Sequence, residues 1–261
     1  MLRAERQAKI LQIVRERGFV ENDELAKIFG VTPTTIRRDL KELNKQNLIH
    51  IDHGGLSVVD YLGEFVEPEY ETKMYVHLEK KKAIAKEAIE YIEEGDTLIL
   101  DSGTTNLQIA KALKTKKHKK ITVVTCDIKA ASELCCEEAI EVIVLGGILR
   151  TSYYSTYGPY AEYILKQIKA DKLFLGIDAA NIDFGVTNLV LEEVPIKQQA
   201  INICKKVFMV ADSAKFGIDA SYKVCSWNSI DCVITDDEIS NEYKSFFEKN
   251  NIHFDLVNSV Q

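Results

Sequence analysis

The chain has 261 residues, of which 46% are hydrophobic and 28% charged, as is ordinary for a globular protein. This length holds one large domain, or a small domain joined to a medium one. Its apolar runs are all shorter than the roughly 18–20 residues of a membrane span, and residues 1–20 lack the plan of a signal peptide. We therefore expect a cytoplasmic protein with no membrane partner.

Charge is unevenly distributed along the chain. Residues 1–56 contain ten lysines and arginines against eight aspartates and glutamates, a net charge of +2. The whole chain contains 33 and 40, which leaves 23 and 32 for residues 57–261, a net charge of −9. A weakly basic segment joined to an acidic remainder favours an oriented approach to a phosphate backbone.

The chain is predicted to begin with two helices. The first covers residues 3–17, where apolar side chains recur at helical spacing before a glycine. A short extended piece follows at residues 19–20. A second helix is expected over residues 24–29, with Asn22 or Asp23 as its N-cap.

A third helix, over residues 32–43, is the most informative feature of the sequence. Thr32 is a good N-cap, and Pro33 suits the first helical position because a backbone N–H has no partner within the helix there. Only Gly30 and Val31 separate this helix from the preceding one. That connection is as tight as a helix-turn-helix requires.

The third helix is amphipathic, with its isoleucine and leucines on one stripe and its threonines and basic residues pointing elsewhere. Outward threonines and paired arginines suit the major groove of DNA. The alternative interpretation is an ordinary helix whose charged face is solvated. The side chains that would contact DNA are Thr32, Thr34, Thr35, Arg37, Arg38 and Lys41, together with His53 in the segment that follows.

Two short apolar strands are predicted after the third helix. They cover residues 48–51 and 56–59 and flank a turn at residues 52–55 that contains two glycines. A β-hairpin in this place is a wing. Residues 1–57 are therefore predicted to form a winged helix-turn-helix domain that binds DNA.

Residues 58–75 lack a clear period and are predicted to form a linker, with room for a short strand against the second domain. From residue 76 to residue 261, strand-like and helical segments alternate. The strands are continuous apolar runs, which is typical of an open α/β domain with helices on both faces of a parallel sheet. Strands are predicted at residues 97–100, 121–125, 141–145, 172–176, 207–211, 232–235 and 254–257, and helices at 79–93, 107–113, 128–136, 161–168, 194–204 and 240–249.

The best candidate for a ligand site in this domain is the Asp-Ser-Gly-Thr-Thr loop at residues 101–105. It follows a strand and leads into a helix, whose N-terminus offers unpaired N–H groups and the positive end of a dipole. An anion such as phosphate would suit that position, although a plain capped turn is the alternative. No Gly-Lys-Ser/Thr follows, so the loop is not a nucleotide-hydrolysing Walker loop. The residues assigned to this loop are Asp101, Ser102, Gly103, Thr104 and Thr105.

Other candidates for the same site also follow predicted strands. Gly147 and Arg150 lie in a glycine turn beside a basic residue, and Lys215 follows another strand as a point charge for an anion. Asp178 and Glu193 could accept hydrogen bonds from sugar hydroxyls. Each also has an ordinary structural explanation: a turn, a surface lysine, or charges at the start of a helix.

The six cysteines include no Cys-x-x-Cys pair, and most lie in or beside apolar segments. We expect reduced, largely buried thiols and not zinc ligands. The sequence predicts no metal and no cofactor.

The N-terminal motifs resemble those of DeoR-type bacterial transcriptional regulators. They are Arg6 with its following apolar pair, Val-Thr-Pro-Thr-Thr-Ile-Arg-Arg-Asp-Leu at 31–40, and His-Gly-Gly at 53–55. The second domain resembles the family's sensor domain through Asp-Ser-Gly-Thr-Thr at 101–105, Thr-Val-Val-Thr at 122–125, Gly-Gly at 146–147 and Asp-Ser-Ala-Lys-Phe-Gly at 212–217.

This resemblance implies that the second domain is similar to ribose-5-phosphate isomerase and binds phosphorylated sugars or related metabolites. It implies that residues 101–105 and Lys215 hold the phosphate. Two positions depart from the family pattern. Ile51 and Asp52 precede His-Gly-Gly where an arginine is usual at the first position, so wing contacts are expected to be weaker. Cys126 stands where an asparagine is usual, which replaces a strong hydrogen-bonding group with a weak one.

Together these features predict a repressor of a carbohydrate-utilisation operon that a phosphorylated sugar or polyol releases from operator DNA. Proteins that bind repeated operator sequences are usually symmetric oligomers, so a homo-oligomer is expected. The first alternative is a sugar-phosphate isomerase. The absence of a lysine between Asp178 and Glu193, which could polarise a carbonyl, counts against it. The second is an adaptor that uses the winged helix for protein contacts.

Overall fold

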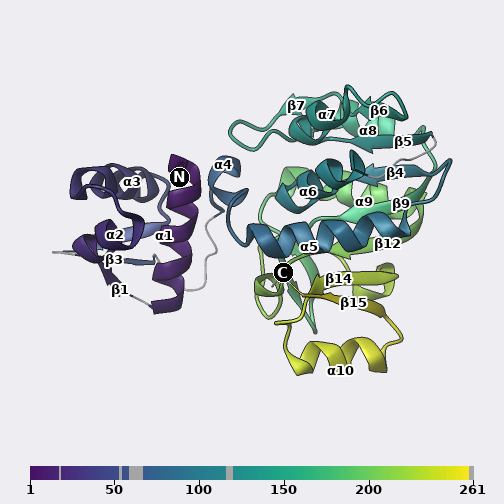
Figure 1. The fold of residues 1–261 in the computed structure, drawn as a ribbon. Coiled ribbons are helices and arrows are strands. Elements are labelled where there is room, and N and C mark those ends of the chain that lie inside the picture. Colours follow the sequence, from purple (N-terminus) through teal and green to yellow (C-terminus); the bar gives the residue numbers. More distant parts are fainter. Residues whose placement is uncertain (18, 53–54, 59–66, 116–119, 259–261) are drawn as a thin grey trace. The chain divides into compact units, whose positions relative to one another are not determined.

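The computed structural model describes residues 1–17, 19–52, 55–58, 67–115 and 120–258 (Figure 1). The chain divides into two compact units, Met1–Val76 and His77–Gln261. In the described part, no helix combines the length and the apolar character needed to cross a membrane.

The first unit contains the three predicted helices. They are α1 (Arg3–Arg17), α2 (Asn22–Phe29) and α3 (Pro33–Lys45). Their apolar faces meet in one core that includes Ile10, Leu25 and Ile36, all fully buried. The second helix begins earlier than predicted: Glu21 occupies its N-cap position without a side-chain cap, so neither Asn22 nor Asp23 is the cap.

A three-stranded antiparallel sheet completes the winged helix-turn-helix. Its strands are β1 (Phe19–Glu21), β2 (Ile49–Asp52) and β3 (Gly55–Val58), in the order β1-β3-β2. The pairing of β2 with β3 confirms the predicted hairpin, and β1 adds a third strand, with Val20 opposite Leu56. His53 lies outside the described residues.

The predicted linker contains a short helix, α4 (Tyr70–Lys73), in the part that the structure describes. Tyr70 and Thr72 are buried there. The strand for which the sequence left room is therefore not formed at residues 67–75; residues 59–66 lie outside the described part.

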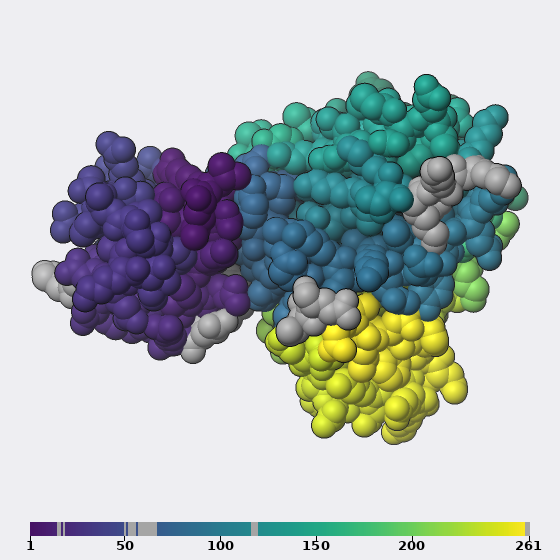
Figure 2. Space-filling model, in the orientation of Figure 1, coloured from purple at the N-terminus to yellow at the C-terminus, as the bar shows by residue number. Residues whose placement is uncertain are grey.

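The second unit is built on a seven-stranded parallel sheet in the order β15-β14-β12-β9-β4-β5-β6. All seven predicted strands are confirmed: β4 and β5 have the predicted ends, and the ends of the other five differ by at most three residues. Strands β15 and β6 form opposite edges of the sheet, so β15 with α10 and the segments around β5 to β7 lie on opposite sides of this unit (Figures 1 and 2). The strands are β4 (Thr97–Leu100), β5 (Ile121–Thr125), β6 (Ile140–Val144), β9 (Ala170–Leu175), β12 (Cys204–Val210), β14 (Cys232–Asp236) and β15 (His253–Val257).

Helices cover both faces of this sheet, as the continuous apolar strands predict. Neighbouring residues of one strand enter different cores: Phe174 belongs to the core with α5, α6 and α7, and Leu173 and Leu175 belong to the core with α8, α9 and α10. The helices are α5 (Leu78–Ala88), α6 (Thr104–Leu113), α7 (Ile128–Leu134), α8 (Pro159–Leu165), α9 (Val194–Ile203) and α10 (Asn241–Lys249).

Two small antiparallel sheets escaped prediction. One consists of β10 (Ala179–Asn181), β11 (Gly185–Asn188) and β13 (Tyr222–Cys225). The other is the hairpin of β7 (Ile148–Leu149) and β8 (Thr156–Tyr157). Both begin in segments that follow the carboxyl ends of the main strands, where ligands of open α/β sheets bind.

Candidate functional site

Helix α3 presents the polar face that the sequence predicts for DNA. Thr34, Arg37, Arg38 and Lys41 are exposed, whereas the apolar stripe is buried. No acidic side chain among the described residues forms an ion pair with either arginine or with Lys41. The face therefore has cationic groups that phosphate or base edges can use.

The start of α3 is held by its threonines. The Thr32 hydroxyl accepts a hydrogen bond from the backbone N–H of Thr35 (3.3 Å), and the two hydroxyls lie 3.0 Å apart. This confirms Thr32 as the N-cap. DNA contacts by these two threonines stay a prediction. Such contacts would involve hydroxyls that already form hydrogen bonds at the start of the helix.

A buried ion pair fixes α3 against α1. The Arg6 guanidinium donates to the Asp39 carboxylate at 2.5 Å, and Arg3 approaches the same carboxylate at 3.4 Å. Asp39 is 1% exposed although it lies between exposed basic residues on the same helix. Both residues belong to the N-terminal motifs, but this pairing was not predicted from the sequence.

In the second unit, most of the predicted ligand residues gather at the carboxyl edge of the sheet. Asp101 follows β4, Cys126 and Asp127 follow β5, and Asp178 lies two residues after Gly176 at the end of β9. These strands are neighbours or next neighbours in the sheet, so the loops that leave them meet.

The centre of this edge is a buried lysine that the sequence analysis did not single out. The Lys197 ammonium, on α9, donates to the Asp101 carboxylate at 2.5 Å and to the backbone oxygen of Gly176 at 2.9 Å. Burial opposes its charge, but the carboxylates of Asp101, Glu193 and Asp178 raise the pKa of Lys197 above its usual value. Lys197 is therefore held as a cation.

Asp101 organises the loop that follows it. Besides Lys197, its carboxylate accepts hydrogen bonds from the backbone N–H groups of Ser102 (2.9 Å) and Gly176 (3.1 Å). Gly176 lies tightly against this loop: a Cβ atom there would lie 3.0 Å from the Ser102 backbone oxygen and 3.3 Å from the Asn106 amide nitrogen, so a larger residue would push the loop away. The loop and β9 are thus packed backbone against backbone.

The start of α6 keeps polar groups without partners. Gly103 occupies the N-cap position with φ 131° and no side-chain cap, and its own N–H donates to Asp127 at 3.0 Å. Among the described residues, the Thr104 hydroxyl and both amide atoms of Asn106 are buried without a hydrogen-bond partner. Ser102 and Thr105 are partly exposed beside them. Unsatisfied buried polar atoms are uncommon in folded proteins, and a bound ligand or water is one way to satisfy them.

Glu193 joins a second predicted residue, Arg150. The Arg150 guanidinium donates to the Glu193 carboxylate at 3.1 Å, and the hydroxyl of Ser155 donates to it at 2.9 Å. Glu193 also acts electrostatically on Asp101, on Lys197 and on the Cys126 thiol. The two predicted residues therefore belong to the same neighbourhood as the loop.

Cys126 and Asp178 line this neighbourhood in different ways. Burial, with the charges of Asp101, Asp127 and Glu193, raises the pKa of the Cys126 thiol above its usual value, so the group is neutral. Asp178 accepts a hydrogen bond from the backbone N–H of Leu189 at 3.0 Å.

For Lys215 and Gly147, contacts within the protein explain the residue type without a ligand. Lys215 acts electrostatically on the buried carboxylate of Asp212, which also pairs with His77 at 3.0 Å. A Cβ atom on Gly147 would meet the backbone oxygen of Tyr157 at 2.4 Å, so the glycine is required by the fold of that segment. Their roles in ligand binding stay predictions.

The cysteines are less uniformly buried than expected. Cys126 and Cys232 are buried and Cys204 and Cys225 partly so, but Cys135 and Cys136 are exposed neighbours on the end of α7.

Comparison with known families agrees with this two-part organisation. Residues 6–61 match the model of the DeoR-like helix-turn-helix domain, and residues 76–237 match that of the DeoR C terminal sensor domain. The chain belongs to the DeoR family. The resemblance read from the motifs is thereby confirmed, and the unit with α3 is the DNA-binding domain of a family of transcriptional regulators.

Curated relatives cover nearly the whole chain. The glycerol-3-phosphate regulon repressor of Escherichia coli strain K12 is 33% identical over 236 residues, which are 90% of this chain and 92% of that protein. The transcriptional regulator GlpR of Haloferax volcanii is 36% identical over 236 residues, 90% of this chain and 91% of that protein. The relatives are regulators, and both matches span both units.

Solved structures similar to the second unit include ribose 5 phosphate isomerase A from Neisseria gonorrhoeae. The TM-score is 0.38 with 18% sequence identity, over 56% of this chain and 54% of that one. A likeness of this degree says nothing about chemistry, and the parallel α/β fold rests on the strand pairing itself.

Proposed function

We propose that this DeoR-family chain is a repressor of a carbohydrate-utilisation operon, and that a phosphorylated sugar or polyol releases it from operator DNA. The proposed ligand binds at the carboxyl edge of the second unit. The observation that carries this assignment is the start of α6, where an uncapped helix N-terminus coincides with buried, unpartnered polar atoms of Thr104 and Asn106.

The charges around this site suit a ligand with a phosphate at one end and hydroxyls at the other. The phosphate would accept from the first-turn N–H groups of α6 and from Ser102 and Thr105. The carboxylates of Asp178 and Glu193 would accept hydrogen bonds from sugar hydroxyls, which a bare anion does not offer. The repressor name of the Escherichia coli relative, which refers to glycerol-3-phosphate, supports this class of ligand.

The DNA half of the proposal is tested with duplexes selected from a random pool by the full chain. Arg38→Ala or Arg37→Ala is expected to abolish retention of the selected sequence, because these exposed guanidiniums face the groove. Arg17→Ala is the matched control, since Arg17 is exposed on α1 and pairs with Glu24 at 2.7 Å. Equal loss in the control, or retention in the α3 variants, would contradict the assignment of α3.

The ligand half is tested by thermal shift against phosphorylated sugars and polyols, with the unphosphorylated compounds beside them. Ser102→Asp should remove stabilisation by the hits through like-charge repulsion with phosphate. Ser132→Asp adds the same charge at an exposed position of α7 and should leave it intact. Unchanged stabilisation in Ser102→Asp would reject the loop as the phosphate site.

Release from DNA requires that the ligand favour one state of the protein. A coupling of roughly 1–3 kcal/mol would lower operator affinity about 5- to 150-fold. Hits that stabilise the protein are therefore titrated against the selected duplex. A ligand that binds without changing DNA affinity, or that raises it, would contradict release by an inducer. Sedimentation with and without the duplex measures whether the chain acts as the expected homo-oligomer.

We propose that the protein has no isomerase activity. Lys197 lies near the carboxylates that an isomerase would need, but it is 3% exposed and donates hydrogen bonds to the protein oxygens of Asp101 and Gly176. A lysine whose pKa is raised in this way does not act as a base. Turnover of pentose or hexose phosphates by the purified chain, lost in Asp178→Asn, would overturn this statement.

A further inference from the structure

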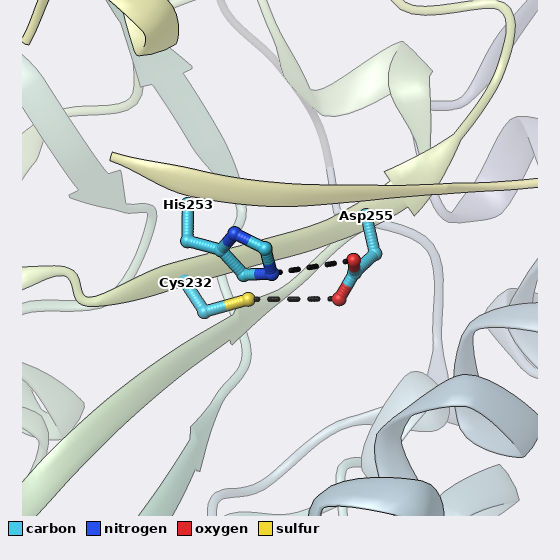
Figure 3. Close-up of side chains that lie close together, drawn as sticks. All are labelled: Cys232, His253 and Asp255. Atoms are coloured by element: carbon cyan, nitrogen blue, oxygen red, sulfur yellow. Dashed lines mark hydrogen bonds and ion pairs between the residues drawn. The ribbon is translucent and has the colours of Figure 1, made fainter. Parts of the chain in front are cut away.

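Three side chains with metal-binding groups converge at the amino edge of the main sheet (Figure 3). Cys232 begins β14 and His253 begins β15, and these two residues are partners in the parallel register. Asp255 lies two residues further along β15, so its side chain is on the same face as that of His253. Two paired strands thus hold all three groups without any loop.

The distances between the ligand atoms fit one small cation. His253 Nε2 lies 3.4 Å from Asp255 Oδ1, and Cys232 Sγ lies 3.8 Å from Asp255 Oδ2. All the potential ligand atoms lie within 4.8 Å of one another. Tetrahedral ligands at about 2.0–2.3 Å from zinc are about 3.3–3.7 Å apart, so the side chains must close by about 1 Å where they are farthest apart.

Access and chemistry point to zinc. The imidazole of His253 is 64% exposed and the carboxylate of Asp255 24% exposed, whereas Cys232 is buried behind them. An ion can therefore enter from solvent and reach the thiol. A sulfur, a nitrogen and a carboxylate oxygen suit a borderline-soft ion, and three protein ligands leave a fourth position open.

The phenol of Tyr91 lies against two of the three side chains. Tyr91 ends η1 (Ile89–Tyr91), and its hydroxyl donates to Asp255 Oδ2 at 2.5 Å and lies 3.2 Å from His253 Nε2. Asp255 can keep this bond while its other oxygen binds a metal, but His253 Nε2 must exchange the phenol for the ion. Carboxylate ligands are commonly oriented by such second hydrogen bonds.

We propose that Cys232, His253 and Asp255 bind Zn²⁺, with Tyr91 positioning the Asp255 carboxylate. Binding displaces the thiol proton to solvent and forms a zinc–thiolate bond. The ion would tie β14 to β15 and to the end of η1. This site lies at the opposite end of the strands from the proposed sugar-phosphate site, so it does not depend on that proposal and does not compete with it.

The test uses the tag-free full chain carrying Cys135→Ser and Cys136→Ser, because that exposed vicinal pair, with sulfurs 3.8 Å apart, could bind metal by itself. Co²⁺ is the probe, since a cobalt–thiolate bond gives a charge-transfer absorption. We expect one equivalent of Co²⁺ to produce this band and one equivalent of Zn²⁺ to abolish it.

Variants of this background separate the site from other thiols. Cys232→Ser should remove the band, and His253→Gln should weaken Co²⁺ binding more than tenfold; His253 is exposed, so this variant is expected to fold. Tyr91→Phe should weaken binding about 10- to 100-fold, as loss of an outer-sphere partner does. Cys204→Ser, at the start of neighbouring β12, should change nothing. No band in the background, a band that survives Cys232→Ser, or unchanged affinity in His253→Gln would each overturn the proposal.

Discussion

The buried ion pair of Lys197 and Asp101 makes the sharpest prediction about the second unit. Replacing Lys197 with methionine keeps most of the side-chain volume but leaves the Asp101 carboxylate buried with only the two backbone N–H donors of Ser102 and Gly176. Both side chains of the pair are 4% exposed, so solvent does not compensate. Removing one partner of such a pair costs about 3–5 kcal/mol of unfolding free energy.

Two further variants isolate this effect. Asp101→Asn combined with Lys197→Met removes the orphaned charge and should recover part of the lost stability, because an amide oxygen can still accept one backbone hydrogen bond. Lys205→Met breaks a pair with Asp171 of similar length, 2.7 Å, but Lys205 is exposed and its loss should be barely measurable.

The assay is urea unfolding of the full chain followed by tryptophan fluorescence. The chain has one tryptophan, Trp227, which is 6% exposed in the second unit, so the signal reports on that unit. In Lys197→Met, burial raises the pKa of Asp101, and a raised carboxyl pKa costs stability as the pH rises through it. The deficit should therefore be smaller at pH 5 than at pH 7. A deficit no larger than that of Lys205→Met, or a double variant no more stable than the single one, would refute the reasoning.

Three other closely packed or hydrogen-bonded positions allow similar tests. Arg6→Met should destabilise the first unit by about 3 kcal/mol and thereby weaken DNA binding. Hydrogen exchange in α1 and α3 measures this loss of stability, and unchanged exchange would contradict the role of the pair. Gly176→Ala should cost about 1–3 kcal/mol and weaken sugar-phosphate binding, because its Cβ would press on the backbone oxygen of Ser102; full ligand-induced thermal stabilisation would disprove it. Against burial, the hydrogen bond from His77 holds the pKa of Asp212 below its usual value, so its stabilisation is present at neutral pH and is lost in acid. Asp212→Asn should therefore be less stable than the parent at pH 7, with a gap in urea midpoint that narrows progressively as the pH falls below about 4; a gap independent of pH would refute this.

The parts of the fold that follow from local rules could be predicted from the sequence. The cap, the proline and the apolar stripe of helix α3 all lie within its own short stretch of sequence. In the structure the helix begins one residue after Thr32. The strands of the main sheet are continuous apolar runs because two different cores take alternate residues, as Leu173 and Phe174 do. Neither feature needs information from distant residues.

The parts that depend on distant contacts could not be predicted in this way. Lys197 shares its helix face with the apolar Val194 and Ala200, but the sequence does not identify its partner, because only the packing of α9 in the fold brings it to Asp101. The same holds for Arg6 and Asp39, which are 33 residues apart. A charged side chain is expected at the surface, so a buried pair becomes visible only when both partners are placed.

Glycines show why the candidate site was only partly predictable. Gly103 and Gly147 look alike in sequence, since each lies a few residues after a predicted strand. In the structure, Gly103 has a positive φ that favours glycine and leads into an uncapped helix N-terminus, where we propose that the ligand binds. Gly147 is instead required by the backbone of Tyr157, ten residues away. A glycine can make room either for a ligand or for another part of the backbone. The local motif does not distinguish these two roles, because the atom that needs the room lies elsewhere in the sequence or outside the chain.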